Sequence, residues 1–328
     1  MKKRTLVLAL ISLVVAIAAP FLIHPLYAMQ ILCFALFAAA FNLVAGYLGL
    51  ISFGHAAFFG MAAYLGGHAV KVWNWPTEVG ILFATLAMAG LGLIFGLLSI
   101  RSKGVYFAMI TMALSQLVYF IAHQAPFTGG EDGMAGIPRG ELFGIISLTD
   151  NLTMYVFVLI TVSIGLAIIW RAVYSPFGQL LMAIRDNEQR VISLGYDVHK
   201  IKLTAFVLSA ALSGMAGATK AIVMQFASQT DIFWNMSGVP VLASLIGGIG
   251  TLPGPVIGAA VMVTLEHALA SLGQWVFFIQ GLVFVLVVLF FRRGIWGEIL
   301  ALLDRRRPRP VPEAGPPLPA PLQDEAER

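Results

Sequence analysis

Residues that could carry out chemistry are sparse in this sequence, and their spacing fits no known reactive site. The six histidines never occur at the i, i+4 spacing that would place two imidazoles on one metal ion. The single cysteine, Cys33, excludes both an internal disulfide framework and a cysteine-based zinc site. The phosphate-binding pattern G-x-x-x-x-G-K-[ST] does not occur, so we do not expect the chain to hydrolyse ATP. We therefore predict no catalytic residue, no metal site and no cofactor in this chain, which is not expected to be an enzyme.

Glycine and proline residues interrupt an otherwise apolar stretch at 238–272. Broken helices at membrane depth are tolerated only inside protein or along a water-filled cavity, and transporters use them at substrate sites. We therefore interpret the stretch as a short or broken span at 238–249 and a full span at 254–272. A tightly packed helix pair without a ligand would explain the same glycines, because Gly250, Gly254 and Gly258 would share one face of a helix. The candidate pathway residues here are Gly247, Gly248, Gly250, Pro253 and Gly254.

One carboxylate, Glu266, falls within the second of these spans. An ionisable group at that depth suggests a functional role, either in a pathway or in an internal ion pair, for which Lys220 is a candidate partner. The alternative is that the span is shifted and Glu266 lies near the outer interface, to which Lys220 would also extend. The polar residues Ser52 and His55, at the start of another apolar run, complete the candidate pathway.

The segment 171–200 combines apolar residues with a charged cluster at 185–190. This pattern is typical of one or two short amphipathic helices that lie on a membrane face. Such a helix can fill a groove on a soluble partner, or it can rest on lipid. The segment is therefore a candidate contact with another protein.

The elements that must position these residues are membrane helices. Hydrophobic residues make up 59% of the 328 residues and charged residues 11%, against about 25% charged residues in soluble domains. Too little polar surface remains to cover a soluble globule, so we predict an all-α polytopic integral membrane protein. A crossing needs about 20 apolar residues, which gives about ten transmembrane helices, at least one of them short or broken. The predicted spans are 5–23, 26–48, 51–70, 79–99, 104–122, 151–170, 201–224, 238–249, 254–272 and 275–291.

The basic start of the chain and the apolar run that follows resemble a secretory signal. Pro20 and the immediately following spans favour an uncleaved first helix instead. The distribution of lysine and arginine sets the orientation: with ten spans and the N-terminus inside, the outer segments hold only Lys71 and Arg139. We therefore expect both termini in the cytoplasm and a multi-pass protein of the bacterial cytoplasmic (inner) membrane.

This topology divides the chain into two parts. Residues 1–292 form the transmembrane domain, with a cytoplasmic loop at 171–200 and an extracytoplasmic loop at 123–150. Residues 293–328 form a tail that is first basic and then rich in proline and acidic residues, and we predict it to be disordered. The basic residues lie on the inner side of the membrane, where they suit anionic lipid, so the net charge of +4 does not indicate nucleic acid as a partner.

Five blocks of the sequence resemble the branched-chain amino acid permeases of ABC importers, of the LivM type. They occur in the order of that family across about 50–260, which makes a chance match improbable. The most telling are the Gly-Gly-x-x-Gly block at 129–133 and the Arg-Asp-Asn-Glu block at 185–188. The blocks are 50–60, 101–111, 128–138, 175–188 and 247–258.

The resemblance implies partners and a docking site. It implies a second homologous permease subunit, two cytoplasmic ATP-binding subunits that hold ATP and magnesium, and a periplasmic or lipid-anchored substrate-binding protein. It also implies that 175–197 is the ATPase-docking loop, although Gln189-Arg190-Val191 replaces the small residues of the family pattern. The candidate docking residues are Arg185, Asp186, Asn187, Glu188 and Gly195.

The predicted function is that of the membrane-spanning subunit of an ABC importer. It would translocate branched-chain or related hydrophobic amino acids into the cytoplasm by alternating access, driven by the partner ATPases. Urea, short amides or aromatic acids are alternative cargoes of the same family. An ion-coupled secondary transporter or channel, which would work alone, and a membrane scaffold, which would transport nothing, are the alternatives outside it.

Overall fold

The computed structural model describes residues 20, 23–270, 273, 275–290 and 294–298. The predicted first span at 5–23 and the tail at 293–328 lie almost entirely outside the described residues. The signal-like start of the chain and most of the terminal basic residues used to predict its orientation lie outside them as well. The positions of the two termini relative to the membrane therefore stay predictions.

The described chain is built from helices. Five of them are long and apolar enough to cross a membrane, namely Pro25–Leu48, Thr77–Ser99, Val105–Gln124, Asn151–Val173 and Val198–Met224. This confirms the all-α membrane class, whereas the count of about ten spans stays a prediction. The helices are α2 (Pro25–Asn42), α3 (His55–Lys71), α4 (Thr77–Ser99), α5 (Val105–Gln124), α6 (Asn151–Val173), α7 (Pro176–Ser193), α8 (Val198–Met224), α9 (Gly238–Gly247), α10 (Gly254–Leu269) and α11 (Trp275–Phe290).

Short elements connect these helices. Two antiparallel pairs of two-residue strands lie in the connections, β1 with β4 and β2 with β3. The strands are β1 (Met134–Ala135), β2 (Glu141–Leu142), β3 (Ile146–Ser147) and β4 (Phe226–Ala227). The single turns are the π-helical η1 (Leu43–Leu48) and the 3₁₀ turns η2 (Pro126–Thr128), η3 (Gly130–Asp132), η4 (Gln229–Asp231) and η5 (Trp234–Ser237).

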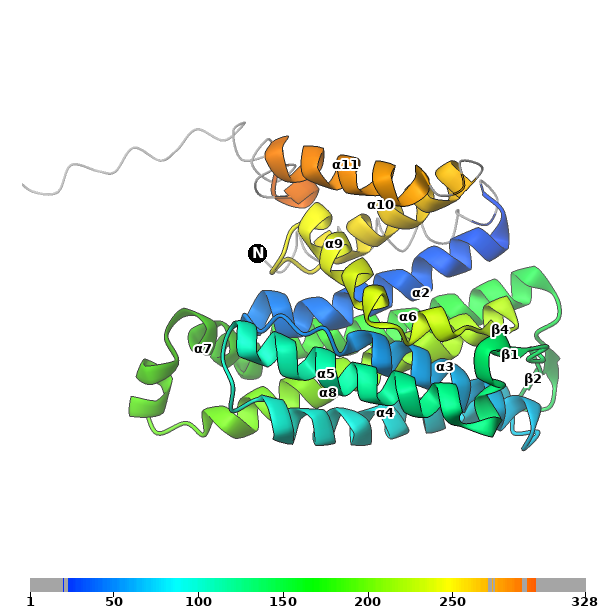
Figure 1. Cartoon of the computed structure of the whole chain (residues 1–328), viewed down its shortest axis with the longest axis horizontal. Helices are drawn as coiled ribbons and strands as arrows, with labels where there is room; N and C mark the ends of the chain where they lie inside the picture. Colours follow the sequence, from blue (N-terminus) through cyan, green and yellow to red (C-terminus); the bar gives the residue numbers. More distant parts are fainter. Residues whose placement is uncertain (1–19, 21–22, 271–272, 274, 291–293, 299–328) are drawn as a thin grey trace, which may run out of the picture.

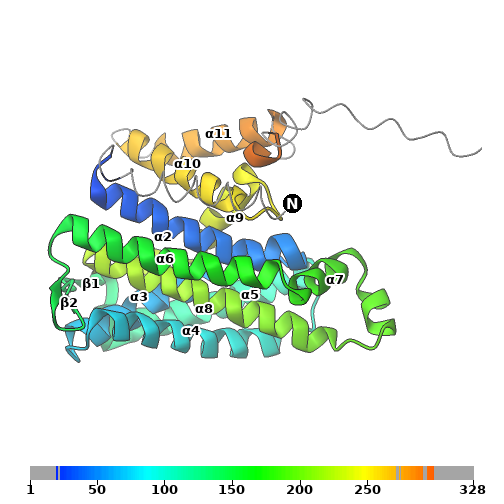
Figure 2. The ribbon, with the colours of Figure 1, turned by 180° about the vertical axis from the view of Figure 1, so that it is seen from behind.

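The long helices lie roughly parallel in one bundle (Figures 1 and 2). Helix α7 projects from one end of this bundle, and the strands lie at the opposite end (Figure 1). Helices α9 and α10 lie against α2, and α11 lies on α9 and α10. We call these two ends the α7 end and the strand end. The long axis of the bundle thus runs parallel to its apolar helices.

Helices α2 and α8 occupy the interior of the bundle. Helix α2 is apolar on all sides, as expected of a helix surrounded by protein, and is buried over most of its length. Helix α8 packs between α2, α3 and α4. Small residues on α8 allow this close approach: a Cβ added at Gly217 would overlap the carbonyl oxygen of Phe59 on α3.

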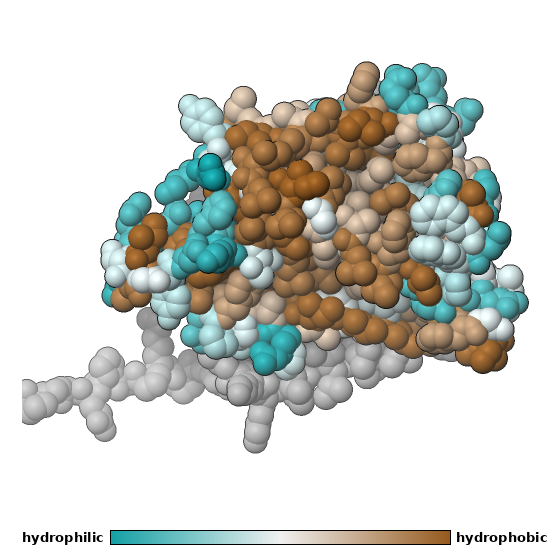
Figure 3. Space-filling model, turned by 90° about the horizontal axis from the view of Figure 1, so that it is seen from below, coloured by the Kyte–Doolittle hydropathy of each residue, from teal (hydrophilic) through white to brown (hydrophobic). Residues whose placement is uncertain are grey.

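Helices α4, α5 and α6 cover the bundle and expose apolar side chains. Leu86 on α4 and Ile160 on α6 are more than half exposed. Figure 3 shows a wide apolar face bounded by hydrophilic residues at both ends. A contiguous apolar surface of this kind requires lipid or a partner protein, as expected of a protein embedded in a bilayer.

The helices break where glycine, proline and polar residues cluster. The span expected at 51–70 is helical only from His55, because residues 49–54 are not helical. The span expected at 238–249 is the ten-residue helix α9, and residues 248–253 separate it from α10. The interpretation of Gly250 as sharing a helix face with Gly254 and Gly258 is wrong, because Gly250 lies in this connection with φ +74°.

Candidate functional site

Helix α7 is the amphipathic segment that the sequence indicates. It begins at Pro176, whose missing N–H costs nothing at a first helical position, and buries Leu181, Ile184 and Val191 on one face. Asn187 has extended backbone angles and divides the helix into two parts. The expectation of one or two short amphipathic helices in 171–200 is therefore met by one helix with a bend.

Glu188 anchors this helix to the rest of the chain. Its Oε1 accepts a hydrogen bond from Nζ of Lys202 on α8 at 2.8 Å, and its Oε2 lies 2.7 Å from Nζ of Lys103 in the α4–α5 turn. Burial raises the pKa of the Glu188 carboxyl, but the hydrogen bonds and charges of Lys103 and Lys202 outweigh it, so the pKa lies below its ordinary value. The carboxylate predicted to face a partner is thus engaged by two lysines of its own chain.

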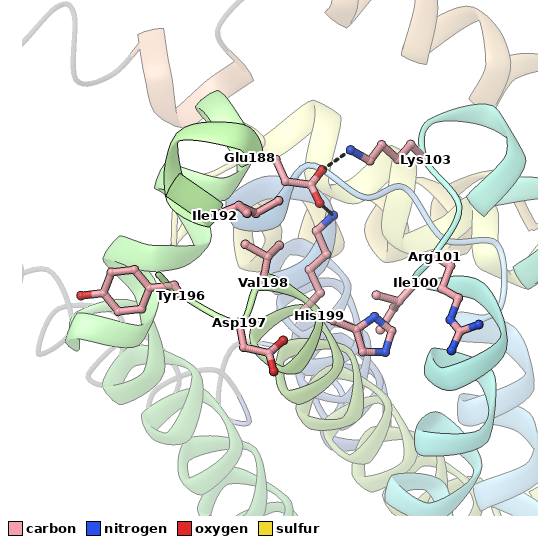
Figure 4. Close-up of a pocket in the computed structure, with 10 residues that line it drawn as sticks. Ile100, Arg101, Lys103, Glu188, Ile192, Tyr196, Asp197, Val198 and His199 are labelled. Carbon is pink, nitrogen blue, oxygen red and sulfur yellow. Dashed lines mark hydrogen bonds and ion pairs between the residues drawn. The ribbon is translucent and has the colours of Figure 1, made fainter. Parts of the chain in front are cut away.

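A cavity of about 340 Å³ lies beside this ion pair. Figure 4 shows its wall, to which the α4–α5 turn contributes Arg101 and Lys103, and the start of α8 contributes His199 and Lys202. Ile192 at the end of α7 and Tyr196 in the turn after it line the other side. The cavity therefore lies between the second part of α7 and the bundle, where Glu188 bridges them.

Arg185 connects α7 to two of the helix breaks. Its Nη1 donates a hydrogen bond to the carbonyl oxygen of Gly46 at 2.6 Å. Its side chain also lies against Gly49, which has φ +79° and has no room for a Cβ beside the arginine. The same guanidinium approaches Gly250. One side chain of α7 therefore holds η1 by a hydrogen bond and lies beside the α9–α10 connection.

Asn42 links these two breaks to each other. Its Nδ2 donates to the carbonyl oxygen of Thr251 at 2.8 Å, and its Oδ1 accepts from the backbone N–H of Gly250 at 2.9 Å. The amide therefore satisfies backbone groups that a helix would otherwise pair. Sequence reasoning missed Asn42, although it is a polar residue within an otherwise apolar run, which is a usable signal.

The remaining candidate docking residues lie on the exposed part of the segment. The side chain of Asp186 is 72% exposed and contacts only the neighbouring Arg185 in the described structure. Asn187 Oδ1 accepts from the backbone N–H of Arg190 and so begins the second part of α7. Gly195 has φ +87°, a conformation that favours glycine, in the turn that leads to α8. These three residues are free to meet another protein.

Ser52 and His55 lie together inside the bundle. Ser52 Oγ accepts from the backbone N–H of Gly54 at 3.1 Å, and His55 Nε2 lies 2.8 Å from Oγ of Ser209 on α8. Ser237 bridges the same break, since its Oγ donates to the carbonyl oxygen of Phe53 at 2.7 Å and accepts from the N–H of Ala56 at 2.9 Å. Two segments far apart in sequence thus meet where α3 and α9 begin.

The glycine-rich break is closely packed. Gly247 contacts the backbone of Gly254, so that neither has room for a side chain. Thr251 Oγ1 accepts from the N–H of Gly254 at 3.2 Å and donates to the carbonyl oxygen of Gly248 at 2.8 Å. Pro253 precedes α10 directly. These residues form a tight connection between α9 and α10.

The ion pair considered for Glu266 is not formed. Lys220 Nζ lies 2.6 Å from Oδ2 of Asp231, and both side chains are largely buried. Glu266 is exposed near the end of α10. Sequence reasoning missed Asp231, although it is the only acidic residue between Asp197 and Glu266 and follows an apolar span.

The described residues hold no cluster of three or more histidine, cysteine, aspartate or glutamate side chains that could bind a metal ion. The arrangement offers instead an anchored helix at one end of a membrane bundle and several linked helix breaks inside it.

Comparison with known sequences agrees with this geometry. Residues 26–290 match the sequence model of the family described as "Branched-chain amino acid transport system / permease component". The chain belongs to this family. It is the membrane-spanning permease subunit of an ABC importer and a multi-pass protein of the inner membrane.

Individual relatives agree with the family assignment. The permease is 25% identical to the high-affinity branched-chain amino acid transport system permease protein LivM of Salmonella typhimurium, over 90% of this chain and 75% of the relative. It is 26% identical to LivM of Escherichia coli, over 86% and 73%. The autoinducer 2 import system permease protein LsrC of Photorhabdus laumondii is 31% identical, over 38% and 40%. No solved structure matches the chain.

Proposed function

We propose that this permease carries branched-chain or closely related hydrophobic amino acids into the cytoplasm, with α7 as the helix on which an ATPase subunit docks. The names of the relatives that align over most of the chain support this cargo. Relatives named for other cargoes align over 38–51% of it. Urea, short amides and aromatic acids are the competing cargoes, which the experiment below separates.

The orientation follows from charge. The α7 end carries Arg101, Lys103, Arg185, Arg190 and Lys200. The excess of lysine and arginine marks the cytoplasmic side. The α7 end therefore faces the cytoplasm, where two ATP-binding subunits are present. The strand end then faces a periplasmic or lipid-anchored substrate-binding protein, and a second homologous permease subunit completes the membrane part.

Arg185 is the observation that carries the proposal. It lies on α7, next to the exposed Asp186, and holds Gly46 and approaches Gly250 on the other side. A force on α7 therefore reaches the end of η1 and the α9–α10 connection through one side chain. Packed elements switch between discrete arrangements rather than deform continuously, so movement of α7 supplies the alternation between outward and inward access.

The test replaces Arg185 in the complete importer, reconstituted with its ATPases and binding protein. We expect Arg185→Met to keep the ATPase subunits bound while leucine uptake falls by about tenfold or more. The variant loses the hydrogen bond to Gly46, which transmits the movement of α7 to the bundle and does not hold the ATPase. Arg101→Met is the matched control, because Arg101 is an exposed arginine at the same end of the bundle but outside α7, and it should keep uptake. Unchanged uptake in Arg185→Met, or uptake by the permease alone, would overturn the proposal.

The cargo is tested in the same vesicles. Leucine, isoleucine and valine should each compete with one another for uptake, because one methylene changes a binding free energy by only about 1–3 kcal/mol. Urea, an aliphatic amide and an aromatic acid should not compete. Competition by one of these compounds alone would assign the permease to that cargo and contradict the amino acid assignment.

A further inference from the structure

The segment between β4 and α9 runs deep into the bundle without forming an α-helix. At the strand end, Phe226 pairs with Ala135. At its other end, Ser237 contacts the start of α3, at Phe53 and Ala56. Between these ends, Asp231 and Ile232 lie against Gly60 on α3, so the segment runs beside the first half of α3. We call residues 228–237 the re-entrant segment.

An irregular backbone at this depth requires a polar environment or protein around it. In hydrocarbon, an unpaired N–H or C=O group is too costly, so such segments are tolerated only inside protein or beside water. The re-entrant segment contains only the short 3₁₀ turns η4 and η5 and exposes Thr230 and Asn235. It lies between α9 and α5 (Figure 1), and lipid alone cannot cover it.

Helix α5 presents a polar row to the re-entrant segment. Thr111, Ser115, Tyr119 and His123 recur every fourth residue, so they share one face. The Thr111 hydroxyl accepts from the backbone N–H of Phe53 at 3.1 Å.

The same row continues along the segment toward the strand end. Tyr119 packs on Phe233 with ring centroids 5.2 Å apart, and His123 Nδ1 lies 2.9 Å from Oε1 of Gln229. The hydroxyl of Ser115 is buried and has no hydrogen-bond partner among the described residues. A buried hydroxyl without a partner carries a free-energy cost, which a polar solute could relieve.

We propose that the re-entrant segment and the polar face of α5 line the route by which the amino acid crosses the membrane. The identity of the cargo rests on the proposed function above. Hydroxyl, amide and backbone groups along the route would replace part of the hydration of the ammonium and carboxylate groups. Contacts of this kind are weak and numerous, which permits both entry and release.

The charges beside the route fit a zwitterion. Lys220 and Asp231, the charged side chains of α8 and the segment at this depth, neutralise each other at 2.6 Å. A route without net fixed charge attracts neither a cation nor an anion. A solute with one charge of each sign has no net charge, so such a route does not repel it. This assignment moves the pathway from the closely packed glycines at 247–254 to a different part of the bundle.

The test measures access of water to the segment in the assembled importer. Cys33 is fully buried and is the only cysteine of the chain, so Cys33→Ala provides a background without reactive thiols. If that variant does not assemble, the wild-type chain serves as the background, with its own reactivity subtracted. Asn235→Cys is compared with Leu86→Cys and Ile160→Cys, whose positions are exposed on the apolar surface of α4 and α6.

A charged, membrane-impermeant methanethiosulfonate is the probe. We expect Asn235→Cys to react at least about tenfold faster than both controls and to be slowed when leucine is being transported. Reaction of Asn235→Cys no faster than that of Leu86→Cys would overturn the proposal, because the segment would then face lipid or a dry interface. Reaction with the probe does not depend on the cargo, so rapid labelling without leucine uptake would contradict the proposed cargo and leave the route in place.

A second pair of variants tests the α5 face. Ser115→Leu adds apolar volume to the route and should lower leucine uptake by about tenfold with the complex still assembled. Leu117→Ser changes the exposed face of the same helix and should not lower uptake comparably. Equal uptake by Ser115→Leu and the wild-type chain would contradict a route along this face.

Discussion

Lys202 and Glu188 are joined across the cavity at the α7 end, with Nζ of the lysine 2.8 Å from Oε1 of the glutamate. Lys202 is only 4% exposed, so its ammonium depends on this partner. Lys103, the second lysine on the same carboxylate, has a side chain that is 62% exposed. Mutations can therefore separate the contribution of the buried ion pair with Lys202 from that of the exposed ion pair with Lys103.

Replacing Glu188 by glutamine should destabilise the protein strongly. The change leaves Lys202 charged and buried without its counter-ion, which costs about 3–5 kcal/mol. Lys103→Gln removes an exposed charge and should lower the free energy of unfolding by about 1 kcal/mol or less. Unfolding of the purified permease in detergent measures both, and equal losses would show that Lys202 is not held by Glu188.

The double replacement of Glu188 by leucine and Lys202 by methionine should recover much of that loss. Replacing a buried ion pair by apolar residues of similar volume is often neutral or stabilising. If Glu188 only anchors α7, the double variant should also keep uptake. If the pair must open during transport, the double variant should be stable and yet transport poorly, and the ratio of uptake to stability distinguishes these outcomes.

The stability contributed by Glu188 should depend on pH in one direction. The pKa of Glu188 in the folded chain lies below the ordinary 4.5. A carboxyl group with a depressed folded pKa contributes stability that is fully present above the unfolded pKa and is lost as pH falls through the folded pKa. The difference in melting temperature between the wild-type chain and Glu188→Gln should therefore be constant near neutral pH and shrink below about pH 4.5. A difference that grew on acidification would contradict this assignment.

Ser209→Ala should weaken the interior near the start of α3. His55 Nε2 and Ser209 Oγ lie 2.8 Å apart, and removing the hydroxyl leaves the buried ring nitrogen unpaired at a cost of about 1–3 kcal/mol. Ser213→Ala, one turn along α8, is the control, because its buried hydroxyl has no partner among the described residues. Ser213→Ala should be neutral or stabilising in the same unfolding experiment, and similar losses in both variants would contradict the hydrogen bond.

Gly217→Ala should disrupt the contact of α8 with α3. The added methyl group would overlap the carbonyl oxygen of Phe59, and overpacking of this kind costs about 1–3 kcal/mol or more. Gly90 lies inside α4 with open space beside it, so Gly90→Ala should instead stabilise the helix by about 0.5–1 kcal/mol. Opposite signs in the two unfolding measurements are the expected result.

Much of the architecture could be predicted from sequence because its causes are local. Long apolar runs indicate α4, α5, α6 and α8 wherever they lie in the bundle, since a bilayer requires a certain length of apolar helix. The charged and apolar pattern of 171–200 indicates an amphipathic helix, and the glycines and prolines at 247–255 mark the break between α9 and α10.

Only the tertiary structure decided which polar groups meet. Asp231 pairs with Lys220, 11 residues earlier near the end of α8, and Arg185 reaches Gly46, 139 residues earlier. The partner of a buried charge is chosen by how helices pack, because a low-dielectric interior leaves each charge dependent on the few polar atoms within reach. The sequence by itself therefore determined that this chain crosses a membrane and where its helices break, and the packing decided what lies at each break.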